Sequence, residues 1–221
     1  MEINSQKHRL AFIFRSLFFP FTFPDVTNSL EKRNYSITLP PGPLPSAPPG
    51  GRIYVSGPIA TKEGCNVVLD SDRKILISEG TSNEKIIDIL EDLTRIAKDD
   101  FFVDMDEEVD YLELTSELDI LSDADPREKI EDFFEGIEAI KKFNEILGTK
   151  TSLFSIDITP KGETPTSKKW FHITIEPRVA TPRRVYYVRA VYRDDNKDAV
   201  VKFTREINSK ILNLIKIIEA S

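Results

Sequence analysis

The residues best suited to chemistry in this 221-residue chain lie on two predicted strands, at 170–176 and 185–193. Because side chains alternate along a strand, each strand presents aromatic and basic residues on one face and apolar residues on the other. Rings that stack on bases, combined with arginines that bind phosphates, are typical of single-stranded nucleic-acid binding. The candidate nucleic-acid or partner face consists of Trp170, His172, Arg178, Arg183, Arg184, Tyr187, Arg189 and Arg193.

An alternative interpretation of this face needs no ligand. One face of an antiparallel sheet is commonly exposed to water, and its arginines then pair with acidic residues elsewhere in the fold. The usual ribonucleoprotein strand motif is absent from the sequence. Both interpretations stay open at this point.

Catalysis has little support in the sequence. The chain has two histidines and one cysteine, and it lacks the patterns G-x-x-x-x-G-K-S/T, G-x-G-x-x-G and G-x-S-x-G. An acidic cluster at 104–110 invites a cation site, but it lacks the central glycine of a calcium-binding loop. A solvated acidic face is the default interpretation of such a cluster. We therefore expect no catalytic, cofactor-binding or metal-binding residues, and no cofactor.

Charge is distributed unevenly along the chain. The whole sequence has 30 basic and 37 acidic residues, a net charge of −7. Residues 99–138 carry 17 acidic and 2 basic residues, whereas residues 150–221 carry 14 basic and 8 acidic residues. Segments of opposite charge favour either attraction between subunits or ion pairs within one chain.

Hydrophobic periodicity predicts an α+β fold with a mostly antiparallel sheet and about three helices packed on one side. The predicted helices are at 83–98, 126–147 and 197–219. The predicted strands are at 10–23, 35–39, 52–55, 66–69, 74–78, 111–121, 152–159, 170–176 and 185–193. We expect a single domain over 1–221. Two lobes, 1–98 and 99–221, are the alternative, with a connection rich in proline and glycine at 40–58.

The composition favours a cytoplasmic location. Cys65 is the only cysteine, so no disulfide can form within one chain. No stretch is long and apolar enough to predict a membrane span. The N-terminus begins like a signal peptide, but Arg15, Pro20 and Pro24 interrupt it, and we expect His8 to lie in a frayed end. The scarcity of Gln and Met favours a thermophilic source.

These observations favour a non-catalytic interaction protein, either a homodimer or an accessory subunit of a larger protein or ribonucleoprotein assembly. The apolar last helix, the Phe-rich first strand and the uneven charge support this hypothesis. The expected partners are a second copy and other protein subunits, with RNA as a further candidate and no membrane. The alternative hypothesis is a small-ligand-binding module with an apolar pocket between a curved sheet and the C-terminal helix.

In size, in its Ile- and charge-rich make-up and in its strand–helix order, the chain resembles small crenarchaeal proteins of no catalytic family. Among these it is similar, in general make-up, to the accessory dimeric subunit of crenarchaeal type III-B CRISPR complexes. The resemblance implies an archaeal, structural subunit of an RNA-guided complex in antiviral defence. No motif carries it, so it assigns no role to any residue.

Overall fold

A computed structural model describes residues 1–15, 25–38, 56–70 and 72–221. The strands are β1 (Glu2–Phe14), β2 (Ser36–Ile37), β3 (Ser56–Lys62), β4 (Cys65–Asp70), β5 (Ile75–Gly80), β6 (Val109–Leu121), β7 (Ile156–Ile158), β8 (Trp170–Pro177) and β9 (Val185–Asp194). The helices are α1 (Asp25–Glu31), α2 (Asn83–Phe101), α3 (Met105–Glu108), α4 (Pro126–Phe133), α5 (Glu138–Leu147) and α6 (Lys197–Glu219).

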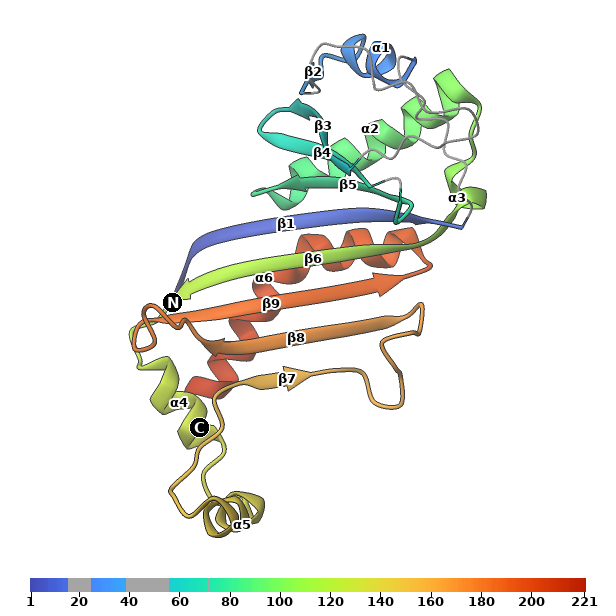
Figure 1. The fold of residues 1–221 in the computed structure, drawn as a ribbon. Helices are drawn as coiled ribbons and strands as arrows, with labels where there is room; N and C mark the ends of the chain where they lie inside the picture. The colour runs from blue at the N-terminus through green and yellow to red at the C-terminus, as the bar shows by residue number, and fades with distance from the viewer. Residues whose placement is uncertain (16–24, 39–55, 71) are drawn as a thin grey trace. The chain divides into compact units, whose positions relative to one another are not determined.

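The strands form one sheet in the order β2-β3-β4-β5-β1-β6-β9-β8-β7 (Figure 1). The pairs β1–β5, β3–β4, β4–β5 and β7–β8 are all antiparallel. The α+β class with a mostly antiparallel sheet is therefore confirmed. The described residues form six helices, however, rather than about three.

The chain divides into two compact units, and each unit combines separate segments of the sequence. Unit 1 comprises residues 1–6, 115–192 and 203–221. Unit 2 comprises residues 7–114 and 193–202. The borders between the units therefore fall inside β1, β6, β9 and α6. The single domain over 1–221 stays a prediction, and so does its alternative of two lobes at 1–98 and 99–221.

Unit 2 is built around α2 and the hairpin strands β4 and β5. The predicted apolar face of α2 is buried, including Ile86, Leu90 and Leu93. The Ser82 side chain caps α2 by accepting the Lys85 N–H. In β1, His8, Leu10, Phe12 and Phe14 are all buried.

Gly80 ends β5 where the strand passes close to Cys65 of β4. A Cβ at Gly80 would lie 2.8 Å from the Cys65 Sγ atom and 3.2 Å from Ile86. We expect Gly80→Ala to lower the free energy of unfolding by about 2 kcal/mol through overpacking. In a Cys65→Ala background, Gly80→Ala should lower the free energy of unfolding by less than half as much, as measured by urea denaturation. An equal loss in both backgrounds would contradict this explanation.

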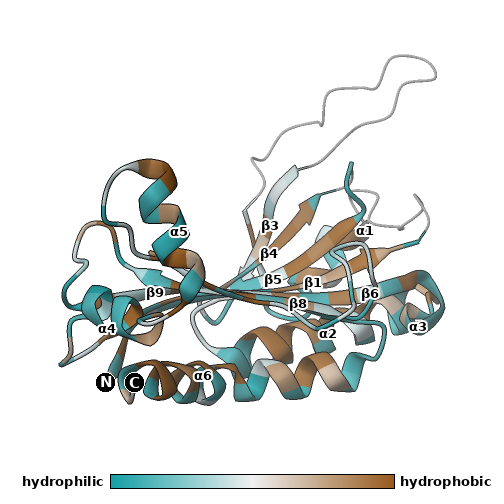
Figure 2. Ribbon diagram, turned by 90° about the horizontal axis from the view of Figure 1, so that it is seen from below, coloured by the Kyte–Doolittle hydropathy of each residue, from teal (hydrophilic) through white to brown (hydrophobic). Residues whose placement is uncertain are grey.

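Unit 1 packs its segment of α6 against one face of β8 and β9. Buried residues on α6 include Ile207, Ile211 and Ile215, and the strands bury Ile175 and Val188. Figure 2 shows α5 on the opposite side of these strands from α6. The opposite face of β8 and β9 is therefore the one that carries the aromatic and basic candidate residues.

Several sequence-based predictions need correction. The N-terminus is not frayed, because β1 starts at Glu2 and His8 is fully buried. The single helix at 126–147 is wrong, because the chain breaks between α4 and α5, where Gly136 has a φ of +85°. Strand β3 was not predicted, since Pro58 lies within it. Residues 16–24, which include four of the Phe-rich positions, and the predicted strand at 52–55 lie outside the described residues.

Candidate interaction surface

The most unusual feature of unit 1 is the segment 133–154, which we call the arm. It contains α5, a helix of ten residues of which none is buried. Gly136 and Gly148, on either side of α5, have φ values of +85° and +66°, which favour glycine. Gly148 ends the helix in the left-handed conformation.

The arm exposes six large apolar side chains. Ile146 is 79 % exposed and Leu147 is 65 % exposed. The other members are Phe133, Ile137, Phe143 and Phe154, which are 37–48 % exposed. Apolar residues that gather on one surface, rather than singly, mark interaction sites in folded proteins.

Polar contacts fix the arm in place. The Thr151 N–H and hydroxyl both donate to the Asn144 side-chain oxygen, each over 2.6 Å. Ser152 donates to Glu131 over 3.0 Å, which ties the end of the arm to α4. Of the α5 side chains, Ile140 and Asn144 are half-buried and the others are exposed. The side of the helix that carries Ile140 and Asn144 therefore faces the rest of the unit, and the other side is left open.

The predicted face on β8 and β9 has a His–Asp pair at one end. His172 Nε2 lies 2.5 Å from Asp157 Oδ1, and Thr174 donates to the same oxygen over 2.8 Å. The Thr174 hydrogen bond is the main cause that lowers the pKa of Asp157, and His172 adds to it. The Trp170 ring lies 5.7 Å from the His172 ring. The structure thus brings Trp170 and His172 together.

At the other end of these strands, Arg178 lies over the Tyr187 ring, 4.7 Å from its centre. Its Nε atom is also 3.4 Å from an oxygen of Asp119 on β6. Burial raises the pKa of Tyr187, and nearby Glu117 raises it further. The Arg178 guanidinium therefore already contacts both the Asp119 carboxylate and the Tyr187 ring.

The other arginines differ in their partners. Arg183 Nε lies 3.7 Å from Asp125, although Arg183 is largely exposed. Arg193 belongs to unit 2, where it pairs with Glu113 over 3.0 Å and lies 5.4 Å from the Tyr111 ring centre.

Arg184 and Arg189 are also exposed. Neither side chain has an ion pair with another described residue. Three of the five arginines of this face are thus already paired with carboxylates, and His172 is paired with Asp157. The interpretation as a water-exposed sheet face explains those four, and Arg184 and Arg189 stay candidates for binding an anion.

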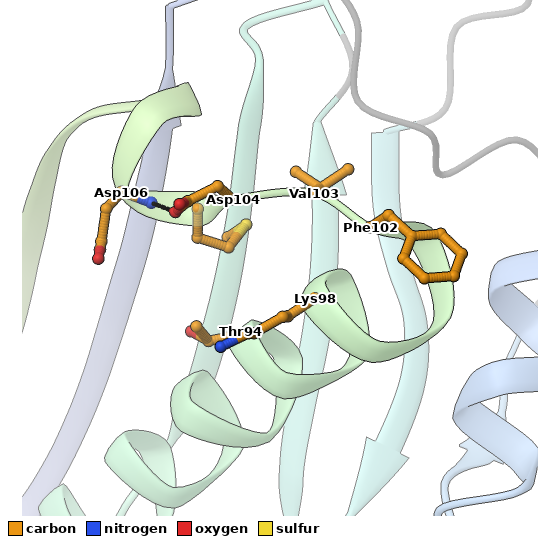
Figure 3. Close-up of a pocket in the computed structure, with 7 residues that line it drawn as sticks. Thr94, Lys98, Phe102, Val103, Asp104 and Asp106 are labelled. Carbon is orange, nitrogen blue, oxygen red and sulfur yellow. Dashed lines mark hydrogen bonds between the residues drawn. The ribbon is translucent and has the colours of Figure 1, made fainter.

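Unit 2 contains a cavity of about 500 Å³ at the C-terminal end of α2 (Figure 3). Thr94 and Lys98 line it from α2, while Asp104 and Asp106 come from the segment that follows. Phe102 is 91 % exposed at its rim and has a φ of +56°, which is unusual for a residue other than glycine. The volume is within the range of small-molecule sites.

The sequence analysis predicted an apolar pocket between the sheet and the C-terminal helix. A smaller cavity, of about 180 Å³, lies nearer to that position. Phe12 and Leu112 of the sheet and Lys197 at the start of α6 line it. It is below the usual size of a small-molecule pocket.

The acidic cluster at 104–110 has structural contacts. Asp104 caps α3 by accepting the Asp106 N–H over 2.9 Å, and Asp110 lies 3.5 Å from Arg15. Within the part of the chain that the structure describes, no three His, Cys, Asp or Glu side chains are grouped as metal ligands. Nor is any helix there long and apolar enough to cross a bilayer.

The sequence analysis missed one buried charge cluster, centred on Asp92 of α2. Its carboxylate accepts hydrogen bonds from the Tyr35 hydroxyl and the Lys62 ammonium, both over 2.9 Å. Arg95 lies 3.3 Å from its second oxygen. Burial alone would raise the pKa of Asp92, but the hydrogen bonds and the two cations outweigh it and lower the pKa. The available signal was an Asp on the apolar face between Ile89 and Leu93.

Comparison with known proteins gave no family assignment. No protein-family model matches the sequence, and no curated protein matches it significantly.

Proposed function

We propose that this chain is an interaction protein rather than a catalyst, and that it works as a subunit of a protein assembly. The observation that carries the proposal is the arm, whose helix α5 buries none of its residues. A folded chain gains stability by burying apolar side chains, so an ordered helix with open apolar residues indicates a contact surface.

The cellular location is part of the same proposal. We place the protein in the cytoplasm, where a reducing environment keeps thiols free. The single cysteine, Cys65, is a buried free thiol, which is compatible with that location.

Affinity purification from the source organism tests the proposal with three forms of the protein. We expect stoichiometric protein partners to be retained by the wild type and lost from Ile146→Glu/Leu147→Glu. The matched control is Ile217→Glu, because Ile217 is 60 % exposed on another helix of the same unit. Partners that bind all three forms equally would show that the arm is not the contact surface.

Nuclease treatment before purification tests the ribonucleoprotein version of the proposal, which the resemblance to an RNA-guided complex suggested. If RNA holds the assembly together through the β8–β9 face, partners are lost after nuclease treatment. They should also be lost from Arg184→Ala/Arg189→Ala, because these are the cations without a carboxylate partner among the described residues. Arg183→Ala, with its carboxylate partner Asp125, is the control.

The cavity beside Phe102 supports a second candidate function, a small-ligand-binding module. Its volume of about 500 Å³ and the exposed Phe102 ring suit a ligand with an apolar or aromatic body. Native mass spectrometry of the purified protein should then show an added mass, which Phe102→Ala reduces. A bare chain from every preparation would remove this candidate.

A further inference from the structure

We propose that the occupant of the arm is a second copy of this chain, paired arm to arm about a two-fold axis. This inference rests on the proposed function and names the partner of the same surface. Three features of the arm support a second copy: its exposed area, its charge and the order of its residues.

The exposed area is sufficient for a dimer. The six apolar side chains of the arm are 37–79 % exposed. At roughly 200 Å² for a whole side chain of this size, they leave about 600 Å² of apolar surface open per copy. Two copies that cover all of this surface would bury about 1,200 Å² in total, the lower limit of a standard protein–protein interface.

The charge of the arm also suits pairing with itself. Residues 133–154 contain three acidic and three basic residues, whereas the whole chain has a net charge of −7. A neutral arm can meet its own copy without repulsion. The same neutrality gives no attraction to an anionic membrane surface or to nucleic acid, both of which bind basic segments.

The order of residues fits an antiparallel pair of α5 helices. Phe143 lies next to the middle of α5, so about a two-fold axis it faces its own copy. The small Ala139 then faces the large Leu147, which lets the two helices approach closely. The acidic residues at the start of the arm also come near Lys150 of the other copy.

Sedimentation equilibrium tests the inference on the full chain over a range of protein concentrations. The wild type should reach twice its mass of 25.2 kDa at micromolar concentrations. Ile146→Glu/Leu147→Glu should weaken the dimer at least about 100-fold, because each copy would then bury two unpaired carboxylates. Ile217→Glu should dimerise like the wild type. A wild type that stays monomeric at 100-fold higher concentration overturns the inference.

Crosslinking tests the two-fold arrangement itself. The only native thiol, Cys65, is buried, so an introduced cysteine reacts alone. A short bismaleimide should join two copies of Phe143→Cys, which meet at the axis. It should leave Ile217→Cys as single chains. Equal crosslinking of both variants would contradict pairing through α5.

These results separate failure of the inference from failure of the proposed function. A monomeric wild type whose purified partners are still lost from Ile146→Glu/Leu147→Glu rejects the second copy and keeps the arm as a contact surface. A dimer that all three forms maintain equally, with partners that bind all three, rejects both.

Discussion

Asp92→Ala should lower the free energy of unfolding by about 3 kcal/mol, the largest loss we expect from one substitution in unit 2. The carboxylate is 12 % exposed and holds both the Lys62 ammonium and the Tyr35 hydroxyl. Its removal leaves a half-buried cation and a buried hydroxyl without their acceptor. For a chain of this length, such a loss lowers the melting temperature by roughly 6–12 °C.

The effect also links distant parts of unit 2. Tyr35, Lys62 and Asp92 come from three separate segments, which the hydrogen bonds join. Tyr35→Phe removes only one neutral donor, so it should lower the free energy of unfolding by about 1 kcal/mol.

The matched control for Asp92→Ala is Asp88→Ala, on the exposed side of the same helix. It changes the same residue type and should alter the free energy of unfolding by less than about 0.5 kcal/mol. Thermal and urea denaturation of the variants measure these differences. Similar losses for Asp92→Ala and Asp88→Ala would show that the cluster does not stabilise the fold.

The second large effect is a loss of stability as the pH falls from 6.5 to 4, caused by His8. This side chain is fully buried in β1, and burial lowers its pKa to about 4. The unfolded chain takes up the same proton near pH 6.5. The unfolded state therefore binds more protons between these two pH values, and acidification favours unfolding.

The magnitude follows from the difference between the two pKa values. The contribution of neutral His8 to the free energy of unfolding is fully present above pH 6.5 and decreases as the pH falls. The free energy of unfolding is therefore lower by about 3 kcal/mol near pH 4. The carboxyl groups whose pKa is lowered, such as Asp92 and Asp157, lose their contribution to the free energy of unfolding only at more acidic pH. The two effects therefore occupy separate parts of the pH curve.

His8→Leu tests this assignment, because it removes the titrating group and keeps a side chain of similar size. We expect its free energy of unfolding to be nearly flat between pH 6.5 and 4.5 by urea denaturation. The only other histidine is His172, so His172→Gln is the control and should keep the wild-type decline. A decline in His8→Leu as steep as in the wild type would assign the effect to other groups.

Local signals predicted much of the fold correctly. Helix α6 occupies 197–219 as its periodicity indicated, and Asp125 with Pro126 begins α4 as predicted. The hairpin of β4 and β5 also follows its alternation and turn residues. Each of these elements is determined by residues close together in the sequence, which is where pattern-based reasoning is strongest.

The misses came from properties that only packing decides. The apolar stripe at 126–147 was correctly seen as apolar, but periodicity does not show whether another element covers it. Gly136 was the available signal for the break before α5. In the same way, alternation placed the arginines of β8 and β9 on one face. It could not show that Arg178 lies against Asp119, which comes from a distant strand.

The division of each unit among separate segments has a consequence for fragments of this protein. Residues 1–6 and 203–221 complete unit 1, while residues 7–14 and 193–202 complete unit 2. Both ends of the chain thus contribute to both units. No single backbone cut separates two self-sufficient pieces, and trimming either terminus past these borders removes strand or helix from both units at once. Deletions that extend from one end past residue 6, or from the other end past residue 203, are therefore expected to be tolerated less well than insertions between α4 and α5.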